Sequence, residues 1–392
     1  SLKTVNAISH FTDWTIAHVH IGGLGWNAMF TFGMLYWLFP RMFRVKLYSK
    51  KLANQHFWIA TLGVILYAIP MYIAGFMQGL MWQEFKPDGT LANNFVDTVI
   101  EMKPFFYLRS IGGLLYLSGA ILMFYNLVKT AKSGKLVANE ETEAVVTKEL
   151  HVNTKGEYWH KVIERKPIQF MILSLVIVAI GGIVEIIPTM IVKSNVPTIK
   201  SVKPYTPLEL YGRDIYIREG CYNCHSQLIR PLRFETVRYG AYSKSGEFVY
   251  DHPFQWGSKR TGPDLAREGG VRGNLWHFNH MIRPKVITPG SIMPAYPWMR
   301  EDDMDIENIG AKIRAMQTLG VPYPEGYDKK AKKDLHAQAH LIALDIVNTS
   351  NQIALKGRNK NDLIKEIEQK DIVAIIAYLQ RLGTDVKVKP TK

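Results

Sequence analysis

Cysteine is almost absent from the 392-residue chain, which holds only Cys221 and Cys224. Two cysteines this close together close no useful structural loop, so a disulfide scaffold is excluded. We also expect no signal peptide, because Ser1–Asp13 lacks the basic and apolar regions that define one. Since the sequence has no initiator methionine either, we expect it to be the tail of a longer protein.

Acidic residues are outnumbered by basic ones, 34 against 48, which gives a formal net charge of +14. Such an excess often indicates nucleic-acid binding. Here the basic residues cluster beside apolar runs, and that pattern is typical of membrane topology. We therefore predict membrane lipid as a partner and no nucleic acid.

Four segments are apolar over the roughly 20 residues that a helix needs to cross a bilayer. These are Thr15–Phe39, Gln55–Gly79, Pro104–Val128 and Ile168–Val192. Basic residues dominate the loop Pro40–Asn54 and recur in Lys129–Pro167, which predicts that both are cytoplasmic, whereas Leu80–Lys103 is mostly acidic, as an outer loop would be. The four spans then alternate, and we expect all residues after the fourth to lie on the outer side of the membrane.

The same patterns divide the chain into parts. The stretch Ser133–Tyr158 is charged and poor in aromatic residues, which is typical of a solvated linker and of a fusion junction. We predict membrane helices in residues 1–130, a linker in 131–158, a membrane anchor in 159–195 and a soluble domain in 196–392.

The two cysteines belong to Cys221-Tyr222-Asn223-Cys224-His225, the C-x-x-C-H pattern of covalent haem c attachment. The thiols attach the haem, and His225 is placed to bind its iron. The alternatives are a thiol redox pair or half of a zinc site, but zinc needs two further ligands and the chain has no other cysteine. The motif therefore predicts a haem c that carries electrons.

A low-spin haem needs a sixth ligand, and methionine raises the reduction potential of such a centre. We predict Met293, because the prolines around it hold an extended loop. Packing in a core is the alternative role for Met293, as for Met281, Met299 and Met316.

Between these ligands, Gly262-Pro263-Asp264-Leu265 is similar to the Gly-Pro-x-Leu segment of class I cytochromes c, whose proline carbonyl contacts Nδ1 of the proximal histidine. The alternative is an ordinary turn. Downstream, Asp371–Leu382 has apolar residues at helical spacing and resembles the C-terminal helix that packs on the N-terminal one in those cytochromes. Before it, we expect the lysine-rich insertion Gly320–Asn361 to be an exposed excursion.

Two histidines, His18 and His20, lie in the first predicted span, where ligating side chains indicate function by default. Side chains at i and i+2 on a helix point about 200° apart, so these two cannot share one iron. We predict that they hold two different haems, one on each side of the helix. The alternative is a pair of hydrogen-bonded interhelical histidines.

The run His10–Asn27, which contains His-Phe-Thr-Asp-Trp-Thr-Ile-Ala-His-Val-His, resembles a late catalytic-subunit helix of cbb3-type cytochrome c oxidases. Through Cys-Tyr-Asn-Cys-His-Ser-Gln and Asp251–Leu265, the region Cys221–Met299 resembles their membrane-anchored mono-haem subunit, as does the anchor Trp159–Val192. The resemblance implies a mainly α fold. Three transmembrane helices would come from a haem-copper oxidase bundle and one would be an anchor, followed by a soluble class I-like cytochrome c domain on the periplasmic side of a bacterial inner membrane.

The resemblance also implies roles for individual residues. His18 would be the proximal ligand of the high-spin haem b and His20 an axial ligand of the low-spin haem b, with His10 and Asp13 near the haem propionates. Arg109 would either meet a propionate or extend to the membrane surface. For Glu185, a helix-pairing or surface-seeking role is preferred to a proton relay.

The three histidine ligands of the family's copper are missing from this sequence, as are most catalytic-subunit helices. We therefore expect copper in the full complex but not on this chain, and a chain that begins inside the catalytic subunit and is not competent alone. The implied function is electron transfer from haem c to the b haems of a proton-pumping oxidase that reduces dioxygen. The remaining catalytic helices and a further or soluble cytochrome c would be partners.

Two other functions stay open at this point. One is a membrane-anchored electron carrier without its own catalytic centre. The other is a component of a nitric oxide reductase, which also joins an anchored cytochrome c to a haem–metal subunit.

Overall fold

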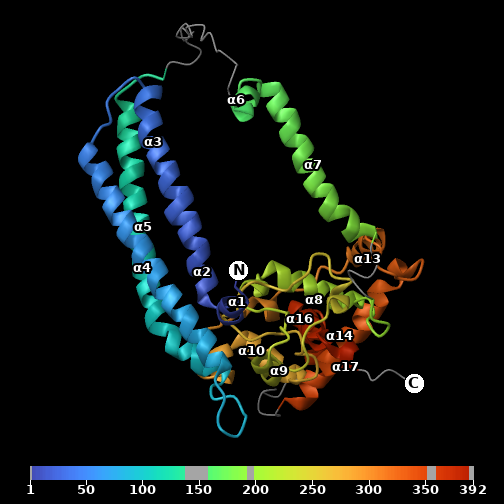
Figure 1. Cartoon of the computed structure of the whole chain (residues 1–392). Helices are drawn as coiled ribbons and strands as arrows, with labels where there is room; N and C mark the ends of the chain where they lie inside the picture. Colours follow the sequence, from blue (N-terminus) through green and yellow to red (C-terminus); the bar gives the residue numbers. More distant parts are fainter. Residues whose placement is uncertain (1, 137–157, 192–197, 351–358, 388–392) are drawn as a thin grey trace. The chain divides into compact units, whose positions relative to one another are not determined.

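The computed structural model describes residues 2–136, 158–191, 198–350 and 359–387, without the side chains of 188–191 (Figure 1). Within these ranges the secondary structure is helical, with isolated bridges and no strand. The predicted mainly α fold is therefore confirmed for this part of the chain. Most of the predicted linker 131–158 lies outside the described residues. The chain forms two compact units, one of residues 1–135 with 199–392 and one of residues 136–198.

Three of the described helices are long and apolar enough to cross a membrane: α4 (Lys50–Gln83), α5 (Phe95–Lys132) and α7 (Pro167–Ile191). They match three of the four predicted spans. The first predicted span is instead built from α2 (Asp13–His20), the π-helical η1 (Ile21–Ala28) and α3 (Met29–Met42). Three glycines in η1 weaken the preference for regular α-helix there. Its membrane crossing stays a prediction.

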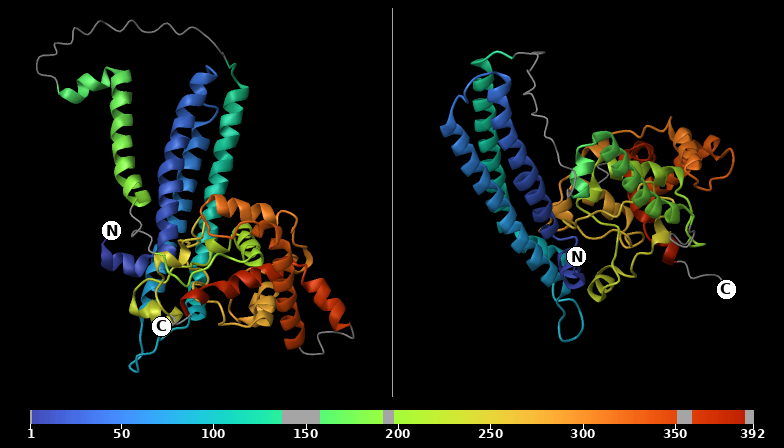
Figure 2. Two further views of the ribbon diagram at one scale, coloured as in Figure 1. Left: turned by 90° about the vertical axis from the view of Figure 1, so that its right-hand side faces the viewer. Right: turned by 45° about the horizontal axis from the view of Figure 1, so that its top comes forward.

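Helices α3, α4 and α5 run side by side in both views of Figure 2. The pair α4 and α5 approaches closely at Gly63 and Gly112, where a Cβ on Gly63 would lie 2.8 Å from the Gly112 carbonyl oxygen. Small residues permit such close backbone contact between membrane helices. Gly75 of α4 is in similar contact with the Trp14 backbone, which places α2 against α4.

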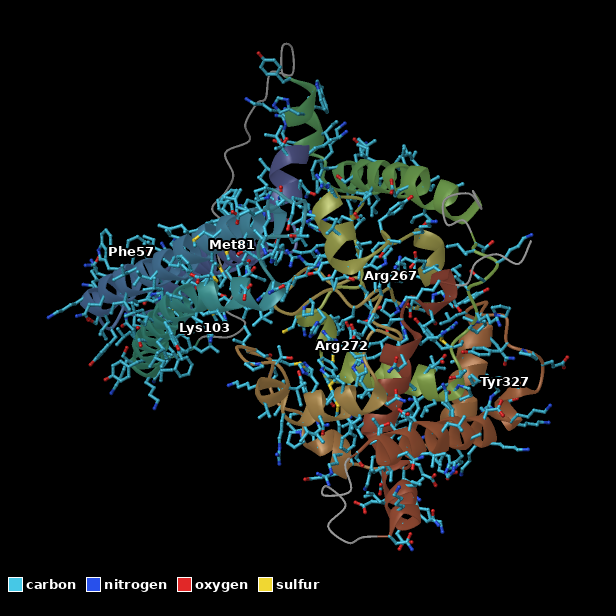
Figure 3. The ribbon with its side chains drawn as sticks, turned by 90° about the horizontal axis from the view of Figure 1, so that it is seen from below. Phe57, Met81, Lys103, Arg267, Arg272 and Tyr327 are labelled. Carbon is cyan, nitrogen blue, oxygen red and sulfur yellow. The ribbon has the colours of Figure 1, made fainter. Side chains whose placement is uncertain are left out.

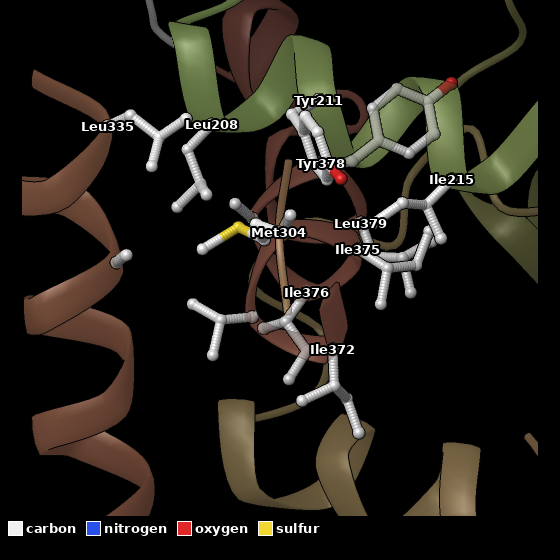
Figure 4. Packing of buried hydrophobic residues seen from close by; sticks show 14 of the residues in the cluster. Leu208, Tyr211, Ile215, Met304, Leu335, Ile372, Ile375, Ile376, Tyr378 and Leu379 are labelled. Carbon is white, nitrogen blue, oxygen red and sulfur yellow. The ribbon is translucent and has the colours of Figure 1, made fainter. Parts of the chain in front are cut away.

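The haem-motif region is built on the crossing of α8 (Pro207–Arg218) and α16 (Asp371–Arg381), where Gly212 lies directly against Ala374. Residues of α16 fill this core, as Figure 4 shows for Ile372, Ile376 and Leu379, each no more than 3% exposed. The predicted packing of the C-terminal helix on the first helix of this region is confirmed.

The insertion 320–361 was expected to be an exposed excursion, and that expectation is wrong for its helix α14 (Ala331–Thr349). Ala331, Leu335, Ala339 and Ala343 are fully buried and belong to the same core as α8 and α16. Apolar residues at every fourth position form a stripe that packs on the core, while polar residues such as Lys332, Lys333 and Asp334 are exposed. Residues 351–358 lie outside the described part.

The other helical elements are short. They are α1 (Lys3–Ser9), α6 (Trp159–Glu164), η3 (Cys221–Asn223), α9 (Arg233–Tyr239), η4 (Ser245–Phe248), α10 (Asn274–Ile282), α11 (Pro284–Ile287), α12 (Trp298–Glu301), α13 (Ile309–Thr318), η5 (Tyr327–Lys329), α15 (Lys360–Ile367) and α17 (Thr384–Lys387).

Candidate haem c site and histidine helix

The cysteine motif forms one tight turn directly after α8. Gly220 has φ +69°, a left-handed conformation that glycine adopts without strain, and the 3₁₀ turn η3 follows it. The backbone N–H groups of Cys224 and His225 both donate to the carbonyl of Cys221, at 3.1 and 2.9 Å. The turn therefore holds both thiols and the histidine within one short segment.

The Cys221 thiol differs from a reactive redox cysteine. Burial, with a smaller contribution from Glu219, raises the pKa of Cys221 to about 12. Reactive redox cysteines have a lowered pKa instead. Among the described residues no group of three His, Cys, Asp or Glu side chains is arranged to hold a metal ion.

All five predicted haem c residues meet at one hollow. A cavity of about 440 Å³ is lined by Cys221, Cys224, His225, Pro263 and Met293. A second cavity of about 130 Å³ shares four of them, all but Cys224. The larger volume is within the range of small-molecule sites, roughly 300–1,000 Å³. This enclosure fits a haem attached to the two cysteines.

His225 is oriented by the loop that carries Pro263. Its Nδ1 lies 2.8 Å from the Pro263 carbonyl oxygen, the contact expected from the Gly-Pro-x-Leu pattern. With Nδ1–H donating there, Nε2 keeps the lone pair that an iron ligand needs. Burial lowers the pKa of His225, which favours the neutral imidazole. Gly262 lies directly against the ring, and a Cβ at this position would overlap His225 Cε1, so a larger residue would collide with it.

The four candidate methionines have different surroundings. Met299 is fully buried and Met316 is 7% exposed, and both pack in the hydrophobic core without lining either cavity. Met281 is also buried in the core but reaches the smaller cavity. Met293 alone among these four lines both cavities. Its iron ligation stays a prediction, which this placement supports.

Sequence reasoning missed the aromatic wall of the hollow, formed by α10 and the residues before it. The Trp276 and His280 rings stack at 4.4 Å, and the Arg272 guanidinium lies 4.9 Å above Trp276. Figure 3 labels Arg272 in this region. Burial lowers the pKa of His277 and of His280 to about 4, so both rings are neutral. A tryptophan and a histidine at i and i+4, between the two predicted ligands, were the available signal.

A buried ion-pair network supports the proximal side. Arg260 is 2% exposed and lies 3.0 Å from Glu235 and 3.2 Å from Asp264. It also donates to the Ser226 hydroxyl at 2.7 Å. Because Ser226 follows His225 and Asp264 follows Pro263, the network fixes both ends of the His225–Pro263 hydrogen bond. The Arg260 guanidinium also stacks on Phe11, at 4.3 Å.

In α2, His18 and His20 lie against different neighbours. His18 is exposed and stacks on Trp14 at 5.3 Å. His20 is half-buried, with Nδ1 2.8 Å from the Ile16 carbonyl oxygen and its ring 4.5 Å from that of Tyr67 on α4. The two rings therefore do not form a pair with each other. Their ligation of two haems stays a prediction.

Three further candidates have these contacts. Asp13 accepts from the Gln78 amide at 2.8 Å and lies 3.6 Å from Lys259 Nζ. Burial, followed by the charges of Arg230 and Arg260, lowers the pKa of His10. Arg109 lies 3.9 Å from the Met71 sulfur and 5.1 Å from the centre of the Phe106 ring. Their predicted roles, and that of Glu185 on α7, remain hypotheses.

Comparison with known proteins gives two family matches that divide the chain. Residues 160–386 match the family "Cytochrome C oxidase, mono-heme subunit/FixO", and residues 1–115 match "Cytochrome C and Quinol oxidase polypeptide I". The first match covers more than half of the chain.

Individual relatives cover the N-terminal part. Cytochrome c oxidase subunit 1 of Rhodobacter capsulatus is 53% identical over 140 residues, 36% of this chain and 26% of that protein. The cbb3-type cytochrome c oxidase subunit CcoN1 of Stutzerimonas stutzeri is 47% identical over 136 residues, 34% of this chain and 29% of that protein. A nitric oxide reductase subunit of the same organism is 26% identical over 142 residues, 35% of this chain and 30% of that protein.

The chain thus spans about a quarter of the length of the oxidase subunits that it matches. Its two matches fall on the two regions in which the haem c hollow and the histidine helix lie. The chain therefore belongs to the mono-haem FixO family of cytochrome c oxidase subunits, joined to a segment of oxidase polypeptide I as a cbb3-type fusion.

Proposed function

We propose that this chain passes electrons through a covalently attached haem c to the b-type haems of a cbb3-type terminal oxidase, which reduces dioxygen to water and pumps protons. The meeting of Cys221, Cys224, His225, Pro263 and Met293 at one hollow is the observation that carries the proposal. A bound haem c supplies an iron that alternates between ferric and ferrous states and so carries one electron.

The residues of the hollow have separate tasks in this proposal. Cys221 and Cys224 hold the haem through thioether bonds, each formed by adding a thiol across a vinyl group without an oxidant. His225 and Met293 would both be ligands of its iron. Pro263 orients His225 by accepting its Nδ1–H, at 2.8 Å. The neutral wall of α10 excludes water from the site.

The histidine helix receives the electrons in this proposal. His20 would bind the low-spin haem b and His18 the high-spin haem b, and copper would be held elsewhere in the full complex. The first span crosses the membrane with α4, α5 and α7, which places the haem c region on the periplasmic side. Further catalytic helices complete the enzyme, and another cytochrome c subunit or a soluble cytochrome c donates electrons.

The two alternatives are less well supported. An anchored carrier without a catalytic partner does not account for the polypeptide I match over residues 1–115. A nitric oxide reductase component has a relative at 26% identity, against 53% for an oxidase subunit over a segment of similar length.

Haem staining after denaturing electrophoresis tests the covalent site. The double variant Cys221→Ala with Cys224→Ala should lose all stain, because thioether bonds are the only covalent link that this chain offers. Each single variant should lose part of it. If the double variant keeps its stain after denaturation, the assignment of the haem c site is wrong.

Redox titration tests the sixth ligand. Met293→His should keep a six-coordinate haem and lower its potential, because imidazole stabilises ferric iron relative to a thioether. Met281→Leu is the control, since Met281 reaches only the smaller cavity, and its potential should not change. An unchanged potential in Met293→His would assign the ligand to another methionine.

A further inference from the structure

The amino-terminal end of α5 forms part of the wall of the haem c hollow. Asn94, Phe95, Val96 and Val99 line the same 440 Å³ cavity as Cys224 and Met293. None of these four residues belongs to the segment that matches the mono-haem subunit family, which begins at residue 160. The hollow is therefore completed by the region that matches polypeptide I.

Hydrogen bonds hold this end of α5 against the haem region. Arg238 on α9 donates to the Asn93 carbonyl at 2.9 Å and to the Trp82 carbonyl at 3.3 Å. Asn93 precedes Asn94, the residue that caps α5 in a capping box with Asp97. The start of the helix is thus tied to a side chain that itself lines the cavity.

Aromatic packing supports the same contact. Trp82 and Phe234 are buried in one cluster with Phe11, and Phe95 packs against it. The Trp82 and Phe95 rings stack at 5.9 Å. Because Phe234 is on α9 and Trp82 is near the end of α4, the cluster joins the haem-motif region to the membrane helices through buried aromatic side chains. The start of α5 is therefore held beside the cavity by the packing of Phe95 against this cluster.

The loop before Met293 rests on α5. Gly290 has φ +89°, and a Cβ built on it would lie 2.8 Å from Ile100 Cδ1 and 3.0 Å from Val96 Cγ1. Two hydrogen bonds between neighbouring residues then shape the loop. Ser291 N–H donates to the Thr288 carbonyl, and Met293 N–H donates to the Ser291 hydroxyl, both at 3.1 Å. A displacement at Gly290 is therefore transmitted over three residues to Met293.

We propose that Val96, Val99 and Ile100 of α5 are positioning residues for the haem c site, which hold the Met293 loop and exclude water from the hollow. This inference rests on the proposed haem c function. The apolar shell around a redox centre controls its solvent access and hence its potential. Haem c in this protein thus depends on a helix that supplies no ligand to it.

The test uses the full chain with its haem, in detergent. Val96→Ala combined with Ile100→Ala should leave covalent haem unchanged. The Met-to-iron charge-transfer band per haem should fall about twofold or more, the potential should decrease, and carbon monoxide should bind ferrous haem c. The matched control is Leu114→Ala with Leu117→Ala, on the same helix at positions 65% and 56% exposed, and it should change none of these.

If the double variant yields too little folded protein, the milder Ile100→Val should give a smaller change in the same direction. An unchanged band, potential and carbon monoxide response in properly recovered Val96 and Ile100 variants would overturn the inference. Failure of the proposed function gives a different result, since the parent chain would then retain no haem after denaturation.

Discussion

The proposed haem c site and the histidine helix both carry sequence motifs but differ in how their side chains are held. His225 is fixed by the Pro263 carbonyl and by Gly262 against its ring. His20 contacts the Ile16 carbonyl of its own helix and the Tyr67 ring, and His18 is exposed beside Trp14. The five residues of the proposed haem c site all come from this chain, so their mutual arrangement is visible here. His18 lies on an exposed face of α2, so its surroundings in the complete complex are not part of this chain.

The surroundings differ in the same way. Arg260, Glu235 and Asp264 form a buried network behind His225, with all three side chains at most 1% exposed. Near His18, Val19 and Trp26 are 59% and 74% exposed. The comparison therefore predicts that substitutions around the proposed haem c site change the stability of the fold and the reduction potential. Substitutions of the α2 histidines should instead remove one cofactor each.

The largest expected effect concerns His18 and His20, in the complete enzyme. His20→Ala should remove the low-spin b signal and block electron entry, because imidazole ligation is lost. His18→Ala should abolish carbon monoxide binding at the high-spin centre while the low-spin haem stays reducible. Reduced-minus-oxidised and carbon monoxide difference spectra measure both.

Absorption of haem c serves as the internal standard for the complex recovered in those two variants. A histidine pair with only a structural role would give the same graded loss of protein for both substitutions. Normal carbon monoxide binding with an undiminished low-spin b band in both would remove the b-haem assignment of this helix.

The next effect tests the network behind His225. Arg260→Gln leaves Glu235 and Asp264 as buried carboxylates without this cation, so the free energy of unfolding should fall by about 3–5 kcal/mol. The surface pair Arg314–Asp328 is the matched control, and Arg314→Gln should cost much less, because water screens this pair. Denaturant titration of the detergent-solubilised chain measures both, and equal losses would contradict the comparison.

A smaller effect should depend on pH. The pKa of His277 in the folded state is lowered to about 4 from 6.5 by burial. Its contribution to stability is therefore complete above 6.5 and is lost as the pH falls toward 4, by about 2 kcal/mol between pH 7 and pH 5. His277→Gln, which does not titrate, should remove that part of the pH dependence. If the free energy of unfolding changes by the same amount between pH 7 and pH 5 in the parent chain and in His277→Gln, this prediction is wrong.

Periodicity and local motifs predicted much of this molecule. Long apolar runs gave α4, α5 and α7, and the spacing of Ile372, Ile375 and Leu379 gave the buried helix α16. The five residues proposed for haem c were chosen from local motifs, because covalent attachment and iron ligation require particular residue types. The cavity brings these five together from three loops.

Features that depend on distant contacts were not predicted. The burial of α14 was hidden by the lysine-rich composition of its segment, although apolar residues recur at every fourth position, at Ala331, Leu335, Ala339 and Ala343. The role of Arg260 required knowledge that Glu235, Asp264 and Phe11 meet around it. The contribution of α5 to the hollow joins residues almost 200 positions apart, and no local pattern encodes such a contact.

The π-helical segment η1 has a consequence for the rotation of the first span. A turn with i to i+5 bonding contains about one residue more than an α-turn, so it shifts the phase of later side chains by about 100°. Before η1, His20 faces Tyr67, and after it Phe32 and Tyr36 face His56, both partners on α4. The segment rotates the second half of the span relative to the first, so that His20 before it and Phe32 and Tyr36 after it all contact α4.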